Sequence, residues 1–119
     1  MGRGFGPGGA TLVRMLRNVP PETYDLVYAS NDAEALLMAQ QLRGALTNAG
    51  WTNATTTETS EPAPKLGITA AQVTPGIAAL TKWAISTGHS PEVRRVPSLP
   101  HPRIVIGKQE PPKPEASPR

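Results

Sequence analysis

The sequence of 119 residues has no cysteine, few aromatic side chains and no long apolar run. The absence of cysteine excludes disulfides and thiolate chemistry, and it leaves the redox compartment undetermined. With one phenylalanine, two tryptophans and two tyrosines, a core must be built mainly from leucine, isoleucine, valine and alanine. No run is long enough to span a bilayer, and the glycine-rich start lacks the apolar centre of a signal peptide. The sequence as it stands therefore predicts a soluble, cytoplasmic chain without a transmembrane segment.

A strong charge is also missing, since the formal net charge is only +3. Most of the excess lies late in the chain, where seven lysines and arginines face three glutamates from Lys82 onward. Nucleic-acid binders usually carry a denser basic stripe with stacking aromatics, so no strong nucleic-acid signature is present. An acidic partner remains compatible with this balance.

Proline and glycine are present in number, but they gather at the two ends. Eight of the 14 prolines fall at or after Pro91, and five of the 11 glycines fall in the first nine residues. This distribution predicts a flexible glycine-rich segment at residues 1–19, with a short helix near residues 11–17, and a proline-rich disordered tail at residues 109–119. Residues 20–108 are expected to form one α/β domain with a small core.

The clearest local pattern is an amphipathic helix between Asn31 and Gly50. Asn31 and Glu34 have capping-box spacing, which predicts Asn31 as the N-cap, and Gly50 falls where a left-handed residue ends a helix. Apolar residues recur at i+3 and i+4 steps along one face: Ala35, Met38, Ala39, Leu42, Ala45, Leu46 and Ala49. Leu37 falls on the outer face, where it is either an isolated exposed leucine or a contact for a partner.

A second helix is predicted to begin at Thr74-Pro75-Gly76 and to end at Gly88, because threonine and proline are favoured at these first positions. Its expected buried stripe comprises Ile77, Leu80, Thr81, Ala84 and Ile85. Strands are predicted at residues 24–29, 51–58, 67–71 and 102–107, with a short irregular strand at residues 91–98. The first of these is expected in the centre of a sheet and the threonine-rich second one at an edge.

The order strand, helix, strand, strand, helix, strand predicts a two-layer α/β (α+β) fold. The expected form is a βαββαβ split βαβ sandwich, with two helices on one face of a mainly antiparallel sheet of four to five strands. A small three-layer parallel sheet is the alternative. The missing helix between the second and third strands favours the two-layer form.

Several short strings resemble a pattern found in uncharacterised bacterial proteins with a small α/β domain. The strings are Asn31-Asp32, Glu34-Ala35, Ala39-Gln40-Gln41-Leu42, Ala45-Leu46, Ala49-Gly50-Trp51, Gly67-Ile68 and Ile104-Val105-Ile106-Gly107-Lys108. In those proteins the domain often follows predicted transmembrane or coiled segments. The resemblance therefore implies a soluble module, membrane-tethered in a longer parent chain, and it carries no activity, cofactor or site.

Catalytic and metal-binding residues are not predicted. His89 and His101 lie in loops and lack the spaced cysteine, histidine or carboxylate partners that a metal site needs. Asp32 and Glu34 have the residue types of an acid/base pair, but a helix start accounts for both of them. No phosphate-binding glycine loop and no nucleophile elbow occurs, so we expect neither a cofactor nor an enzyme.

A small-anion site is one functional alternative. The turns Ser30-Asn31-Asp32 and Thr74-Pro75-Gly76 each lead from a strand into a helix N-terminus, where free amides and the helix dipole attract anions. We expect the two turns at the same edge of the sheet, with Ser30, Asn31, Asp32, Thr74 and Gly76 around a nucleotide or phosphate and with Arg103 or Lys108 supplying charge. Asp32 opposes this, because it already places negative charge there.

The leading functional prediction is a non-enzymatic interaction or sensory domain. Its expected contact residues are Leu37, Arg94, Arg95 and Arg103, together with the threonine-rich strand. A protein partner or self-association fits these residues, although a solvated strand face also explains the arginines.

Overall fold

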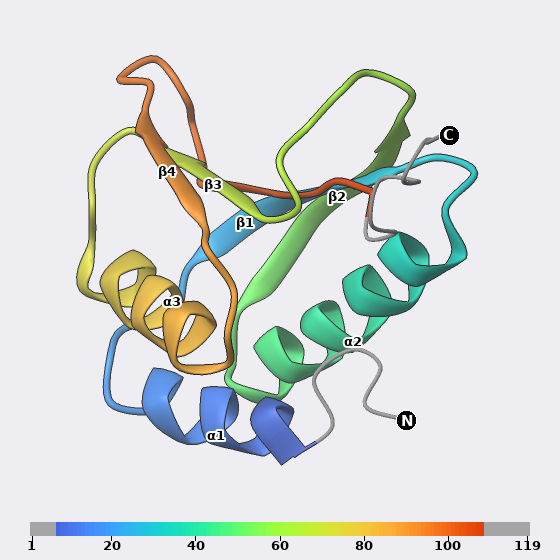
Figure 1. The fold of residues 1–119 in the computed structure, drawn as a ribbon. Helices are drawn as coiled ribbons and strands as arrows, with labels where there is room; N and C mark the ends of the chain where they lie inside the picture. The colour runs from blue at the N-terminus through green and yellow to red at the C-terminus, as the bar shows by residue number, and fades with distance from the viewer. Residues whose placement is uncertain (1–6, 109–119) are drawn as a thin grey trace.

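The computed structural model describes residues 7–108 and shows a two-layer fold (Figure 1). Helices α1, α2 and α3 lie on one face of a five-stranded sheet. The elements in chain order are α1 (Pro7–Leu16), β1 (Thr23–Ala29), α2 (Ala33–Asn48), β2 (Thr52–Thr59), β3 (Gly67–Ala70), α3 (Pro75–Ser86), β4 (Glu92–Arg95) and β5 (Arg103–Ile106). The predicted two-layer α/β class is confirmed. The tail at residues 109–119 and the first six residues, both predicted to be flexible, lie outside the described residues.

The sheet has the strand order β2-β1-β5-β3-β4, which puts the last strand in the middle. β1 is parallel to β2 and to β5, β3 is parallel to β4, and β3 is antiparallel to β5. The two strands of each βαβ unit are therefore neighbours, whereas a split βαβ sandwich would separate them, and the sheet is mainly parallel. β5 joins the units because it pairs with the inner edge of each.

Both long helices begin at a side-chain cap, but the first cap is one residue later than predicted. Asp32 is the N-cap of α2, and its Oδ1 accepts a hydrogen bond of 3.0 Å from the Ala35 amide. Asn31 has a φ of 60°, a left-handed conformation that asparagine tolerates, so it closes the turn instead of capping the helix. Thr74 caps α3 as predicted and accepts from the Ile77 amide at 3.2 Å.

The buried face of α3 is rotated from the predicted stripe. Trp83 is fully buried together with Ile77, whereas Ile85 is 60% exposed. The prediction of Ile85 as a core residue is wrong, because the buried arc runs from Ile77 through Leu80 toward Trp83 and so leaves Ile85 on the outer side. The large indole supplies core volume in a chain with few aromatic residues.

The core also extends upstream of Pro20. Leu12 and Leu16 of α1 are fully buried, and α1 packs against both α2 and α3 (Figure 1). The glycine-rich start predicts that residues 1–19 lie outside the domain. In the structure, Leu12 and Leu16 of α1 belong to the same hydrophobic core as the sheet, and Val13 and Met15 pack against it.

Candidate functional site

The candidate site lies on the sheet face opposite the helices, here called the open face. Side chains alternate between the two faces of a strand, so Leu26, Ile68 and Ile104 are buried under the helices while their neighbours point the other way. Residues of the open face are more accessible: Val27, Thr69 and Val105 are half-buried, and Arg94 and Arg103 are exposed.

Strand register places these residues in two rows across the sheet. The first row joins Arg94, Thr69, Arg103 and Asp25, because Thr69 pairs with Arg94 on one side and with Arg103 on the other. Two strand spacings separate the two arginine Cα atoms, which is about 10 Å. Thr69 thus occupies the strand position between the two arginines.

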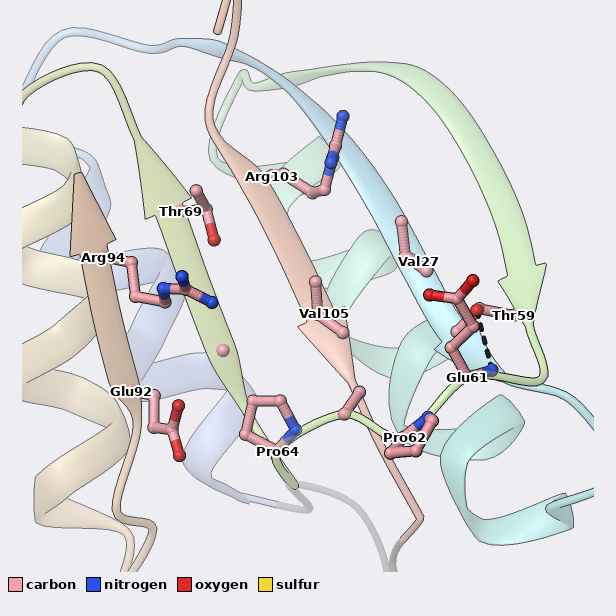
Figure 2. A pocket seen from close by; sticks show the side chains of 12 residues that line it. Val27, Thr59, Glu61, Pro62, Pro64, Thr69, Glu92, Arg94, Arg103 and Val105 are labelled. Carbon is pink, nitrogen blue, oxygen red and sulfur yellow. Dashed lines mark hydrogen bonds between the residues drawn. The ribbon is translucent and has the colours of Figure 1, made fainter. Parts of the chain in front are cut away.

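The second row is apolar at its centre. It runs through Glu92, Gly67, Val105 and Val27 on β4, β3, β5 and β1. The loop at residues 60–66 lies beside this row, and the loop and the row line a groove (Figure 2). The groove has a volume of about 270 Å³. We call it the Arg94–Arg103 groove; its lining residues are Val27, Thr59, Glu61, Pro62, Ala63, Pro64, Gly67, Thr69, Glu92, Arg94, Arg103 and Val105.

The loop wall of the groove is held by backbone contacts that require glycine. The Gly107 amide donates to the Pro64 carbonyl oxygen at 2.9 Å, and a side chain at Gly107 would collide with the backbone of Ala63 and Pro64. At Gly67 a Cβ would lie 3.0 Å from the Pro64 ring. The two glycines therefore let the loop lie close to the sheet and give the groove its wall.

Electrostatically the groove is mixed, with two arginines and two glutamates around its apolar floor. Within residues 7–108 neither the Arg94 nor the Arg103 guanidinium forms an ion pair or a hydrogen bond. The Asp25 carboxylate next to Arg103 accepts from the Thr55 hydroxyl at 2.8 Å. Guanidinium groups bind carboxylates and phosphates through paired hydrogen bonds, so two of them beside a hydroxyl can hold an anionic group.

Only part of the predicted interaction surface comes together in the structure. Arg94 and Arg103 both line the groove, but Arg95 pairs in register with Ala70 and so points to the other face. Leu37 is 36% exposed on α2, in the helix layer. The sequence pattern does not predict Thr69 or the loop wall as part of a site, since a hydroxyl on a short strand gives no signal until the strand order is known.

The two turns predicted to share an anion do not meet. β1 and β3 run in opposite directions because β5 is parallel to one and antiparallel to the other, so their carboxyl ends lie at opposite ends of the sheet. The space beside the Thr74 turn is occupied by the side chains of Glu22 and Trp51. The Thr74 hydroxyl donates to Glu22 Oε2, and a Cβ on Gly76 would lie 2.7 Å from Trp51 Cζ2. Thr74 and Gly76 thus serve capping and close packing.

The other turn borders a second hollow, of about 490 Å³, at the carboxyl ends of β1 and β5. Ser30, Asn31 and Lys108 line it together with residues 59–63. Because β1 and β5 are parallel, the chain after β5 brings Lys108 beside the Ser30 turn, whereas Arg103 lies at the opposite end of β5. The Asp32 carboxylate is buried and is used by the Ala35 amide, so it does not face a ligand.

The two histidines lie in the loops that precede β4 and β5. His89 Nδ1 lies 2.9 Å from Thr87 Oγ1, and burial is the main cause that lowers the pKa of His89 below its usual range. In the part of the chain that the structure describes, no three His, Asp or Glu side chains come close enough to hold a metal ion. No helix between residues 7 and 108 is long and apolar enough to cross a membrane.

Fold and site together define a small two-layer α/β domain with a mixed-charge groove on the uncovered face of its sheet. A scan of protein-family models and searches of curated proteins and of solved structures find no significant match to this chain.

Proposed function

We propose that the protein is a non-enzymatic interaction domain that binds a segment of a partner protein in the Arg94–Arg103 groove. One observation carries this proposal: two arginines, whose guanidinium groups have no partner within residues 7–108, line an apolar groove on a sheet face that no helix of the described residues covers. Arginine is enriched at protein interfaces, which combine an apolar centre with a polar rim.

The groove geometry indicates what such a segment contains. A carboxylate placed over Thr69 faces Arg94 and Arg103 from its two sides, in the row that register defines. An apolar side chain of the same segment then lies over Val27 and Val105 in the adjacent row. Glu61 and Glu92 at the margins disfavour a segment that is acidic throughout. The preferred segment therefore has one acidic residue next to an apolar one.

A capture experiment with matched variants tests this proposal. The immobilised protein is exposed to an extract of cells that express it, and the retained proteins are quantified by mass spectrometry. Arg94→Glu/Arg103→Glu reverses both groove charges. Arg14→Glu/Arg17→Glu makes the same net change at two exposed residues in and just after α1 and is the control.

We expect a specific protein to be retained by the wild type and by the control, and to fall at least tenfold with the groove variant. Equal retention by all three proteins, or no specific retention at all, contradicts binding in the groove. Circular dichroism of each variant confirms that exposed charge reversals leave the fold intact.

A second candidate function is binding of a small anion, such as a phosphate or nucleotide, in the hollow beside Ser30. The observation that favours it is Lys108, a cation that the parallel pairing of β1 and β5 brings to the Ser30–Asn31 turn. Thermal unfolding with inorganic phosphate and with ATP tests it. A rise in melting temperature that Lys108→Ala abolishes supports this function, and an unchanged temperature contradicts it.

We also propose that the domain is the soluble module of a longer, membrane-associated bacterial protein. This proposal depends on the resemblance of residues 31–51 and 104–108 to the bacterial domain pattern. The full reading frame tests it, since an upstream membrane-spanning segment is expected and a frame without one contradicts it.

A further inference from the structure

The two edges of the sheet differ in how they are protected from other strands. β4 has four residues, of which Glu92, Arg94 and Arg95 are charged. β2 has eight residues, mostly exposed threonines, without proline or lysine and with Glu58 as its one charge. Short length, charge and proline are the usual devices that prevent an edge strand from pairing. β2 is long, has one charged residue and has no proline, so its free backbone edge can pair with another strand.

The hydrogen-bonding direction of β2 shows which backbone groups are offered. The Thr59 carbonyl oxygen accepts from the Ser30 amide at 2.8 Å, on the side of β1. Backbone N–H and C=O groups alternate in direction from one residue to the next along a strand. Those of Thr57 and Thr55 therefore also point toward β1. Thr56 and Glu58 consequently direct their N–H and C=O groups away from the sheet, where no strand of residues 7–108 lies beside β2.

A bulge limits the usable edge. The register with β1 shifts after Tyr24, so that Tyr24 pairs with Asn53 but Asp25 pairs with Thr55. The Asn53 side chain consolidates this irregularity by donating to the Thr55 carbonyl oxygen at 2.8 Å. The regular edge therefore consists of residues 55–59.

We propose that a second copy of this chain pairs antiparallel with residues 55–59 of β2, which makes one continuous ten-stranded sheet. A twofold axis at Thr57 places Thr56 of each copy opposite Glu58 of the other. These are the residues with outward N–H and C=O groups, so each Thr56–Glu58 pair exchanges two backbone hydrogen bonds. On the open face Thr57 meets Thr57, and Thr55 meets Thr59, which are favourable cross-strand pairs.

The opposite charges of Arg43 and Glu58 favour a second copy of the chain as the partner, and they favour this register. Arg43 on α2 donates to Thr56 Oγ1 at 3.3 Å. Cross-strand partners share a face, so Glu58 of the second copy lies beside Thr56 and within reach of Arg43. A register shifted by two residues toward the end of β2 places the two Glu58 carboxylates opposite each other, which is unfavourable.

The helix side of β2 also has room for this glutamate. A hollow of about 150 Å³ lies there between α2 and the strand, lined by Tyr28, Leu36, Ala39, Gln40, Arg43 and Thr56. Leu36 is 39% exposed at its border. The methylene groups of Glu58 from the second copy cover this leucine while its carboxylate meets Arg43.

Charge reversal at the two partners tests the dimer by sedimentation equilibrium. The wild type is expected to be a reversible dimer. Arg43→Glu and Glu58→Arg each place like charges at both symmetric contacts, so each alone dissociates at least tenfold more readily. An equimolar mixture of the two variants restores opposite charges at both contacts and is expected to dimerise again.

A wild type that stays monomeric at millimolar concentration overturns the proposal, as does a dimer that neither reversal weakens. A mixture that fails to recover when both single variants are monomeric overturns the stated register. Self-association at β2 is independent of the proposed groove function. The Arg94→Glu/Arg103→Glu variant keeps the dimer while losing partner capture, so failure of one proposal is distinguishable from failure of the other.

Discussion

At the scale of residues, two buried polar atoms mark the contact between β1 and the start of β2. Tyr24 is fully buried and Trp51 is 3% exposed, and their ring centroids lie 6.2 Å apart. Within the described residues neither the Tyr24 hydroxyl nor Trp51 Nε1 has a hydrogen-bond partner. Burial raises the pKa of Tyr24 to about 12, although Arg43 acts in the opposite direction.

This burial predicts an alkaline loss of stability. Unfolded tyrosine ionises near its ordinary pKa of 10.0, whereas folded Tyr24 ionises only near 12. Between these values the unfolded state loses the proton first, so the free energy of unfolding falls as pH rises from 10 to 12. Tyr24→Phe removes the ionisable group and is expected to abolish this part of the loss, as measured by urea unfolding at each pH.

Tyr28→Phe is the matched control for this measurement, because Tyr28 is on the same strand and is only half-buried. The control is expected to keep the alkaline loss. An identical pH dependence in wild type and Tyr24→Phe contradicts the assignment. Near pH 7 Tyr24→Phe is expected to be close to neutral in stability, since it removes a hydroxyl without a protein partner.

At the scale of elements, α1 shows how packing converts a weak helix signal into part of the core. This helix has only ten residues and begins with Pro7, Gly8 and Gly9. A helix this short is marginal in water by itself. Leu12 and Leu16 are nevertheless fully buried against α2 and α3. Burial of these two leucines, more than helix propensity, therefore accounts for the helix.

Leu12→Ala measures this contribution. Removing a fully buried leucine leaves a cavity and is expected to lower the free energy of unfolding by about 2–5 kcal/mol. Arg14→Ala, at an exposed position of the same helix, is expected to change it by less than about 0.5 kcal/mol. Chemical denaturation measures both, and an equally small effect for Leu12→Ala shows that α1 is not a structural part of the domain.

At the scale of the whole molecule, β5 is the element that unites two βαβ units. It pairs with β1 on one side and with β3 on the other, and it contributes Ile104 and Ile106 to the core at full burial. The units are not joined by any other strand pairing in the described chain. The Arg94–Arg103 groove depends on the same strand, because β5 sets Arg103 beside Thr69.

A truncation tests this role of β5. A chain ending at Leu99 lacks β5 and is expected to lose its fold, since both inner strand edges and the core beneath them become exposed. A chain ending at Lys108 retains β5 and is the control. Dispersion of amide resonances in NMR spectra distinguishes the two results, and a well-dispersed spectrum of the shorter chain shows that the units fold without β5.

Local interactions made much of this fold predictable. The apolar period of α2, the Thr74 cap and the positive φ of Gly50 and Gly88 all follow from contacts within a few residues. The sequence pattern predicts the first cap one position too early, because Asn31 and Asp32 are both good caps and only the backbone of the turn distinguishes them. Ile85 is wrongly predicted to be buried because the spacing of apolar residues determines that a helix is amphipathic but does not determine which residue lies at the middle of its buried face.

By itself the sequence determined the α/β class, the two long helices and the edge character of β2, because propensity, capping and hydrophobic period act over short stretches of chain. Only the tertiary structure decided that β5 lies between β1 and β3, that α1 joins the core, and that Arg94 and Arg103 flank Thr69 while the two predicted turns lie apart. These features depend on strand order and direction, which arise from pairings between segments distant in the chain. The candidate groove belongs to this second group.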